Sequence, residues 1–192
     1  MEENNLNKNK SKHFFLRIIA ANGILAALYV ILTVVGYPLS HGLMQVRISE
    51  MLNLFVFFNP TYTIGLTIGC LLANLFSMNG IYDIIIGTLA TLIGCVTASL
   101  FARFVKNLFF TGWFPCLVNA IVVPFVIILS SLGTGNEMAL MATNYFMMFG
   151  FVLLGEAIAI LAIGYPIMMI LMKTVKNFGR SILTTRNMDF KW

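Results

Sequence analysis

The chain has 192 residues, of which 59% are hydrophobic and only 10% charged, and its mean hydropathy is +0.91. A soluble domain of this size could not bury so much apolar surface, so the composition predicts an all-α integral membrane protein. The formal net charge of +5 could suggest a nucleic-acid partner, but the basic residues lie in the tails and one loop rather than along an amphipathic stripe, and we expect no such partner.

The first 13 residues are polar and carry no apolar period, which predicts a disordered cytoplasmic tail. The apolar run at 14–35 is long enough to span a membrane and lacks the small-residue cleavage site of a signal peptide. On this first helix Gly23 and Ala27 form a face of small residues. Such a face lets another helix approach closely, and that helix could belong to this chain or to a partner protein that docks there.

A loop rich in helix breakers follows at 36–46, and a second helix is expected at 48–58, where Pro60 ends it. This helix is too short to cross a bilayer upright. At its start Arg47 and Glu50 lie three residues apart and so share one helical face, where we expect them to interact as a pair. Ionisable residues inside a membrane are costly and by default indicate a functional site.

The third and fourth helices, expected at 61–76 and 81–104, carry small residues at helical spacing, which predicts close packing against neighbouring helices. These small residues are Gly65, Gly69 and Ala73 in the third helix, and Gly87, Thr91, Gly94 and Ala98 in the fourth. Asp83 lies one turn before Gly87, so we expect its side chain to point into the bundle rather than toward lipid.

The fifth and sixth helices are expected at 114–131 and 140–172. Because proline has no amide hydrogen, Pro124 frees a backbone carbonyl one turn earlier, beside the side chain of Asn119. This position is either a packing kink or a ligand contact. Glu156 lies near the middle of the sixth helix.

Six spans would place both termini on the same side of the cell membrane. All 12 Lys and Arg residues except Arg47 lie in the tails, at the base of the first helix or in the loop between the fourth and fifth helices, all on that side. The positive-inside rule therefore predicts that both termini are cytoplasmic. We expect one six-transmembrane-helix bundle at 14–172, preceded by the tail at 1–13 and followed by a basic cytoplasmic tail at 173–192.

The polar side chains of this bundle are expected to converge on an outward-facing cavity, which would be the substrate-binding site. Its residues would be Arg47, Glu50, Asn53, Asn74, Tyr82, Asp83, Asn119, Asn144 and Glu156. An amide such as Asn22 or Asn74 could instead only bridge two helices. Three carboxylates within the membrane, however, together favour a function.

The sequence contains no phosphate-binding loop, no HExxH motif, no CxxC pair and no nucleophile elbow, so we expect neither enzymatic activity nor ATP hydrolysis by the chain itself. Cys70, Cys95 and Cys116 lie in apolar segments without metal-ligand spacing, and neither a metal nor a cofactor is expected. Two alternatives stay open. One is a small membrane enzyme that uses Glu50 or Asp83 as acid or base, and the other is an assembly subunit whose acids pair only with arginine.

Several segments resemble the QueT-type queuosine-precursor transporters, and the resemblance covers most of residues 15–172. They are VRISEMLNLFVFFNP, GLTIGCLLANL, YDIIIGTLATLIG, LVNAIVVP with Asn119, and the pair Gly155-Glu156. The resemblance implies the six-helix fold of the S-component of an energy-coupling-factor (ECF) transporter, which captures a vitamin-like molecule outside the cell. Uptake would be driven by a separate coupling membrane protein and two ATP-binding-cassette (ABC) ATPases.

The ligand implied by this resemblance is a queuosine precursor, preQ1 or preQ0, although an S-component for another vitamin-like molecule is an alternative. A 7-deazaguanine offers an N1–H and an exocyclic amine to a carboxylate, a 6-oxo acceptor and, in preQ1, an aminomethyl cation. Two carboxylates could bind the ring edge and the cation, and Arg47 or an amide could donate to the oxo group. Tyr82 or a phenylalanine could stack on the ring. The roles of the individual acids stay open.

Overall fold

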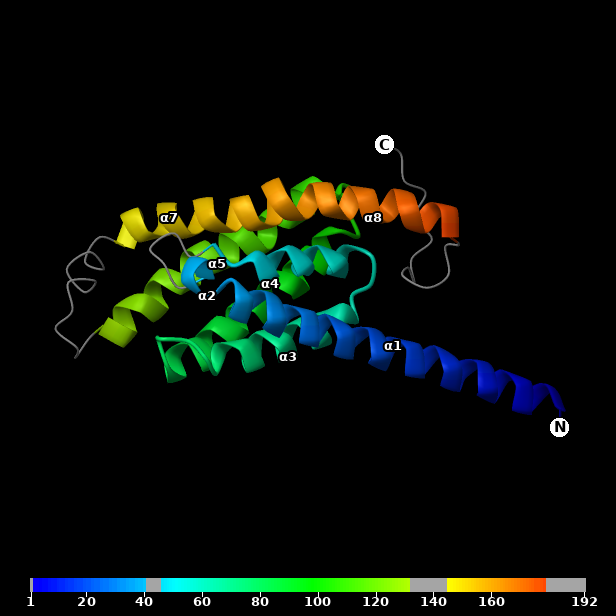
Figure 1. Ribbon diagram of the computed structural model, residues 1–192. Helices are drawn as coiled ribbons and strands as arrows, with labels where there is room; N and C mark the ends of the chain where they lie inside the picture. The colour runs from blue at the N-terminus through cyan, green and yellow to red at the C-terminus, as the bar shows by residue number, and fades with distance from the viewer. Residues whose placement is uncertain (1, 41–45, 132–144, 179–192) are drawn as a thin grey trace.

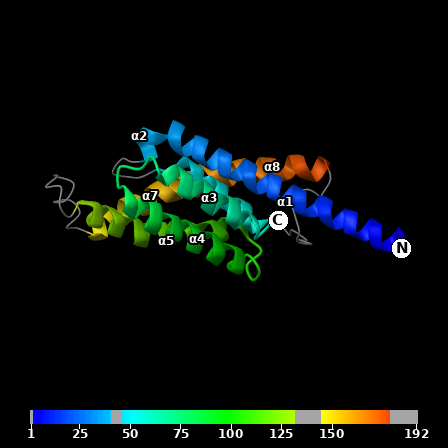
Figure 2. The same ribbon diagram turned by 90° about the horizontal axis from the view of Figure 1, so that it is seen from below.

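The fold is helical throughout the part of the chain that the computed structural model describes, which comprises residues 2–40, 46–131 and 145–178. The helices run back and forth along one common axis (Figures 1 and 2). The start of α1 (Glu2–Val35) and the end of α8 (Tyr165–Phe178) lie at the same end of the bundle (Figure 1). No strand occurs among the described residues, so the predicted all-α class is confirmed.

Between α1 and α8 the elements vary in winding as well as in length. In chain order they are α2 (Tyr37–Ser40), the 3₁₀ helix η1 (Ile48–Phe57), α3 (Tyr62–Asn74), the π-helical segment η2 (Asp83–Gly87), α4 (Thr88–Phe101), α5 (Leu108–Ser131), α7 (Tyr145–Ala157) and the π-helical segment η3 (Ile158–Gly164). The last two elements continue directly into α8, so α7, η3 and α8 form one helical stretch.

Four helical segments are long and apolar enough to cross a membrane, which makes the chain a multi-pass membrane protein. They are Lys12–Val35, Asp83–Phe101, Leu108–Ser130 and Tyr145–Thr174. Two shorter apolar helices, Ile48–Phe57 and Tyr62–Asn74, occupy the places of the expected second and third spans. Length and composition therefore confirm four of the expected spans, whereas the six-span arrangement stays a prediction.

Three helix ends differ from the sequence prediction. The first helix continues back to Glu2, into the segment expected to be disordered, because extending an existing helix costs much less than starting one. The fifth begins at Leu108 rather than near residue 114, because the side chain of Asn107 accepts a 2.9 Å hydrogen bond from the amide of Phe109 and caps the helix. The last continues to Phe178, into the expected C-terminal tail.

The 3₁₀ helix η1 lies at the centre of the bundle, where it packs against α1, α3, α4, α5, η3 and α8. Its ten residues extend over about 20 Å, compared with about 15 Å for an α-helix of the same length. Residues three apart stack in rows on such a helix. The row with Met51 and Leu54 faces glycines on two neighbours: a Cβ on Gly164 would lie 2.7 Å from Met51 Cβ, and one on Gly112 3.1 Å from Leu54 Cδ2.

The first and third helices pack against each other at very short range. The amide of Gly65 donates a 2.7 Å hydrogen bond to the side chain of Asn22, which therefore bridges the two helices. A Cβ on Gly65 would lie 2.5 Å from the carbonyl oxygen of Asn22, and a Cβ on Gly69 would lie 2.8 Å from Tyr29 Cβ. The narrow glycine face expected on α3 is thus confirmed, and its partner is α1.

The small-residue face of α1 points away from this interface. Gly23 and Ala27 are both exposed, and no described atom lies within 4 Å of a Cβ placed on Gly23. Between them Ile24 is 62% exposed, and Ile31 further along the helix is 56% exposed. Within the described part of the chain, this face is therefore free of helix packing.

We predict that Gly65→Ala and Gly69→Ala each lower the free energy of unfolding by about 1 to 3 kcal/mol, because the added methyl group overpacks the α1–α3 contact. Gly150→Ala is the matched control, since a Cβ there meets nothing within 4 Å. Thermal unfolding of the detergent-solubilised variants measures the difference. A melting temperature of Gly65→Ala equal to that of the control would contradict the close packing.

Candidate functional site

A cluster of buried polar side chains lies toward the end of the bundle opposite the start of α1. The chain enters η1, leaves α3 and enters η2 at this end, which brings Arg47, Asn74 and Asp83 together (Figure 1). Each of the three residues is at most 4% exposed. Their polar atoms need partners inside the protein, because the hydrocarbon around a membrane bundle offers no hydrogen bonds.

Arg47 and Asp83 form an ion pair that Asn74 holds in place. The distance from Arg47 Nη2 to Asp83 Oδ2 is 4.0 Å, and Nη2 also donates a hydrogen bond to Asn74 Oδ1. The amide of Asn74 donates to the backbone carbonyl of Asp83 at 2.8 Å. Ser77 and Asn79 donate to Asp83 Oδ2 as well. A single amide thus fixes both the guanidinium and the helical turn that carries its carboxylate.

The expected ion pair between Arg47 and Glu50 is wrong, because the structure pairs Arg47 with Asp83 instead. Glu50 is completely buried and accepts hydrogen bonds from the hydroxyl of Tyr29 and the amide of Asn53. Both donors are neutral, so local dipoles rather than a contacting cation hold this carboxyl group. Arg47 and Glu50 interact electrostatically over a longer distance.

Asn119 connects this cluster to Glu156 on α7. Its amide donates to Glu156 Oε1 at 3.1 Å, and the same side chain interacts with the carboxyl group of Glu50. The two carboxyl groups also interact electrostatically with each other. Acids from η1 and α7 therefore meet at one amide of α5.

Two buried atoms of the cluster have no hydrogen-bond partner among the described residues, Arg47 Nε and Glu156 Oε2. A buried polar atom without a partner costs about 1 to 3 kcal/mol, and more when the group is charged. Such atoms in native proteins call for an explanation, and a bound ligand would supply one. With Glu50 and Asp83 the cluster holds three acids and one arginine, an excess of two acids, which favours a ligand rich in N–H groups or positively charged.

Most of the residues predicted for the site come together in this cluster. They are Arg47, Glu50, Asn53, Asn74, Asp83, Asn119 and Glu156. Tyr82 is 41% exposed and lies outside the buried cluster, and Asn144 lies outside the described residues.

Sequence reasoning missed Tyr29, whose hydroxyl binds Glu50 from α1. It is 0% exposed in the middle of an apolar helix. A phenol in such a place is a detectable signal, since its hydroxyl group needs a hydrogen-bond partner when the ring is buried.

We predict that Arg47→Met and Asp83→Asn each destabilise the protein by about 3 to 5 kcal/mol, because each leaves an uncompensated buried partner. The double variant should lose clearly less free energy of unfolding than the sum of the two single variants. The matched control is the double-mutant cycle of Arg47→Met and Glu50→Gln, in which the two losses of unfolding free energy should be closer to additive. Unfolding titrations with SDS measure both cycles, and a stronger coupling of Arg47 to Glu50 than to Asp83 would contradict the observed pairing.

Comparison with known proteins places these observations in a family. A family model described as QueT transporter matches residues 19–173. The queuosine precursor transporter QueT of Lactococcus lactis subsp. cremoris is 43% identical over 106 residues, which cover 54% of this chain and 60% of that relative. The aligned part is thus less than two thirds of the relative's length. No solved structure matches the chain.

Both matches are transporters, so the alternative of a small membrane enzyme is wrong. The helices long enough to cross a membrane agree with a transport protein. Since the family model covers most of its residues, the chain belongs to the QueT transporter family.

Proposed function

We propose that this chain is the substrate-binding S-component of an ECF-type ABC importer and captures a queuosine precursor, preQ1 or preQ0, outside the cell. Membership of the QueT family supports transport, and the substrate named for the similar Lactococcus lactis protein suggests the ligand. The sequence has no phosphate-binding loop, so ATP hydrolysis falls to partners, namely a coupling membrane protein and two ABC ATPases. The observation that carries the ligand-binding part is the buried Oε2 of Glu156, which has no hydrogen-bond partner among the described residues.

Glu156 suits the hydrogen-bonding edge of a 7-deazaguanine. The N1–H and the exocyclic amine of that ring point in the same direction, and a carboxylate can accept from both. Asn119 donates to Oε1 at 3.1 Å and leaves Oε2 free. The 6-oxo group would accept from a donor such as the unpartnered Nε of Arg47. A carboxylate contact of this kind is worth most where water is excluded, and Glu156 is 1% exposed.

The remaining acids suit the substituent that distinguishes the two precursors. PreQ1 carries an aminomethyl cation where preQ0 carries a neutral nitrile. The excess of acids over arginine in the cluster would be reduced by this cation, and we assign the contact to Glu50 or Asp83. Tyr82 directly precedes Asp83 and is 41% exposed, so in this proposal it stacks on the ring at the entrance of the site.

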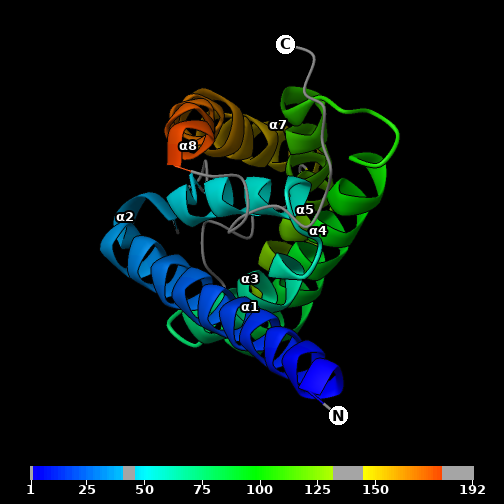
Figure 3. The same ribbon diagram turned by 90° about the vertical axis from the view of Figure 1, so that its right-hand side faces the viewer.

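The proposed orientation has both termini in the cytoplasm and the polar cluster toward the outside. The start of α1, the connection from α4 to α5 and the end of α8 lie at one end of the bundle (Figures 2 and 3). The basic residues of these segments are Lys8, Lys10, Lys12, Arg17, Arg103, Lys106, Lys173 and Lys176. Their concentration at one end follows the positive-inside rule and supports six spanning helices with the acids at the opposite end.

The exposed small-residue face of α1 is the proposed docking face for the coupling protein. Gly23 and Ala27 are free of packing within the described residues, so a helix of another protein could approach the α1 backbone there. The buried polar cluster contacts α1 through Tyr29, on the face that packs against α3. Docking and ligand binding would therefore use different sides of one helix.

We predict that Glu156→Gln weakens the binding of both precursors by about 2 kcal/mol or more, roughly 30-fold, because it removes a charge-assisted contact to the shared ring edge. Asp83→Asn or Glu50→Gln should instead weaken preQ1 selectively, because only preQ1 carries the cation. Titration calorimetry on the purified full-length variants measures both ligands.

Two outcomes of this titration separate the parts of the proposal. If the parent protein binds neither precursor, the assigned substrate is wrong. If the parent binds both and Glu156→Gln binds them equally well, the substrate stands but the assignment of Glu156 is wrong. A cooperative thermal unfolding transition above the temperature of the titration shows that each variant is folded when it is measured.

We also predict that Gly23→Leu or Ala27→Leu leaves ligand binding in detergent intact but abolishes uptake by cells that contain the coupling module. The added side chain would keep the partner helix from approaching α1. Gly150→Leu adds the same bulk on α7, where a Cβ meets nothing within 4 Å, and should leave uptake unchanged. Normal uptake by both α1 variants would rule out this docking face.

A further inference from the structure

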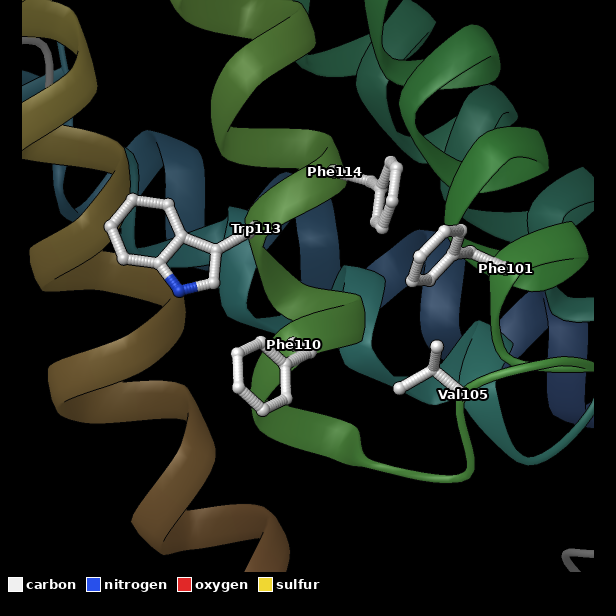
Figure 4. Close-up of a pocket in the computed structure, with 5 residues that line it drawn as sticks. All are labelled: Phe101, Val105, Phe110, Trp113 and Phe114. Carbon is white, nitrogen blue, oxygen red and sulfur yellow. The ribbon is translucent and has the colours of Figure 1, made fainter.

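An open apolar groove of about 490 Å³ lies between the end of α4 and the start of α5, and it plays no part in the polar cluster. It is lined by Phe101, Val105, Phe110, Trp113 and Phe114 (Figure 4). The first two side chains come from the end of α4 and the loop after it, and the other three come from α5. The lining is almost entirely apolar, so the groove fits a hydrocarbon chain.

The walls of this groove are held in place without a ligand. The rings of Phe101 and Phe114 lie against each other, with their centroids 4.2 Å apart. The connecting loop is fixed to the start of α5 by Asn107, whose side chain accepts from the amide of Phe109 and whose carbonyl accepts from the hydroxyl of Thr111 at 2.9 Å. A preformed groove of this kind loses little conformational entropy on binding.

Two cationic side chains lie in the loop beside the groove, at the level of the membrane surface. Arg103 and Lys106 are both exposed and flank Val105 in the connecting loop. One membrane span ends at Phe101 and the next begins at Leu108, so this loop lies at the bilayer boundary whichever side it faces. Neither α4, α5 nor the loop between them contains an acidic residue that could neutralise these cations.

We propose that this groove is a binding site for an anionic phospholipid. An acyl chain lies along the aromatic walls, and the phosphate of the headgroup contacts Arg103 and Lys106. Basic residues at the membrane boundary attract anionic lipids in this way, and the groove adds a defined place for the chain. The proposal does not depend on the identity of the transported molecule, because the groove shares no residue with the polar cluster.

Trp113 gives a direct probe of the groove. The chain has two tryptophans, so the Trp192→Phe variant leaves Trp113 as the single tryptophan. This variant is reconstituted into phosphatidylcholine bilayers that contain the same small fraction of either dibrominated phosphatidylglycerol or dibrominated phosphatidylcholine, whose bromines quench tryptophan on contact. We expect the apparent association of the anionic lipid to be about 25-fold stronger, about fivefold for each of the two basic residues.

Charge variants in the same background test the headgroup contact. Arg103→Gln and Lys106→Gln should each lower this preference about fivefold, the effect of removing one basic residue near the membrane surface. Arg17→Gln removes an exposed cation from α1 and is the matched control, which should keep the preference. Equal quenching of the parent by both lipids would overturn the proposal, and so would an effect of Arg17→Gln equal to that of the loop variants.

A groove variant tests the acyl-chain contact separately. Val105→Phe keeps both cations and fills part of the groove, so quenching by the brominated anionic lipid should fall severalfold. Full quenching in this variant would mean that the lipid is held by charge alone beside an unoccupied groove, and it would overturn the site as proposed.

Discussion

The packing of the helices in the bundle depends on a row of polar side chains along η1. Because a 3₁₀ helix has three residues per turn, Glu50 and Asn53 lie directly above one another, and Glu50 accepts a hydrogen bond from Asn53; Arg47 precedes them as the N-cap residue of η1. The neighbouring helices supply the polar partners of this row. These partners are Tyr29 from α1, Asn74 from α3, Asp83 from η2, Cys95 from α4 and Asn119 from α5. Since lipid offers no alternative hydrogen bonds, each contact determines where a neighbouring helix must lie.

Most polar atoms of this cluster have hydrogen-bond partners within the protein before any ligand binds, and this affects how a ligand is recognised. Tyr29 and Asn53 hold Glu50, and Asn74 holds the guanidinium of Arg47. A ligand would therefore meet acids in fixed positions and would need to satisfy only the few atoms that find no partner in the described part of the chain, such as Glu156 Oε2. Preorganisation of this kind reduces the entropy lost on binding and penalises ligands with the wrong hydrogen-bonding edge.

The sequence predicted the class, the places of the apolar helices and most members of the polar cluster, because charged residues are few and costly in an apolar chain. It did not identify the partner of Arg47, since spacing along one helix places Glu50 nearby but says nothing of Asp83, which comes from another helix. The 3₁₀ winding of η1 was equally hidden, because packing against all neighbours rather than local propensity selects it. The early start of α5 could have been read from the capping asparagine at 107.

Each π-helical segment lies next to a buried acid: η2 begins at Asp83, and η3 begins two residues after Glu156. A π turn holds one residue more than an α turn, so each residue that follows occupies the position that its predecessor would have in a regular α-helix. Removing a single residue from η3 would restore regular α-helical winding and leave α8 in the same orientation relative to α7, because the wider turn only accommodates the extra residue. Homologues with a regular helix here should therefore show a one-residue gap when they are aligned with this chain, and the same face of α8 would still meet the lipid.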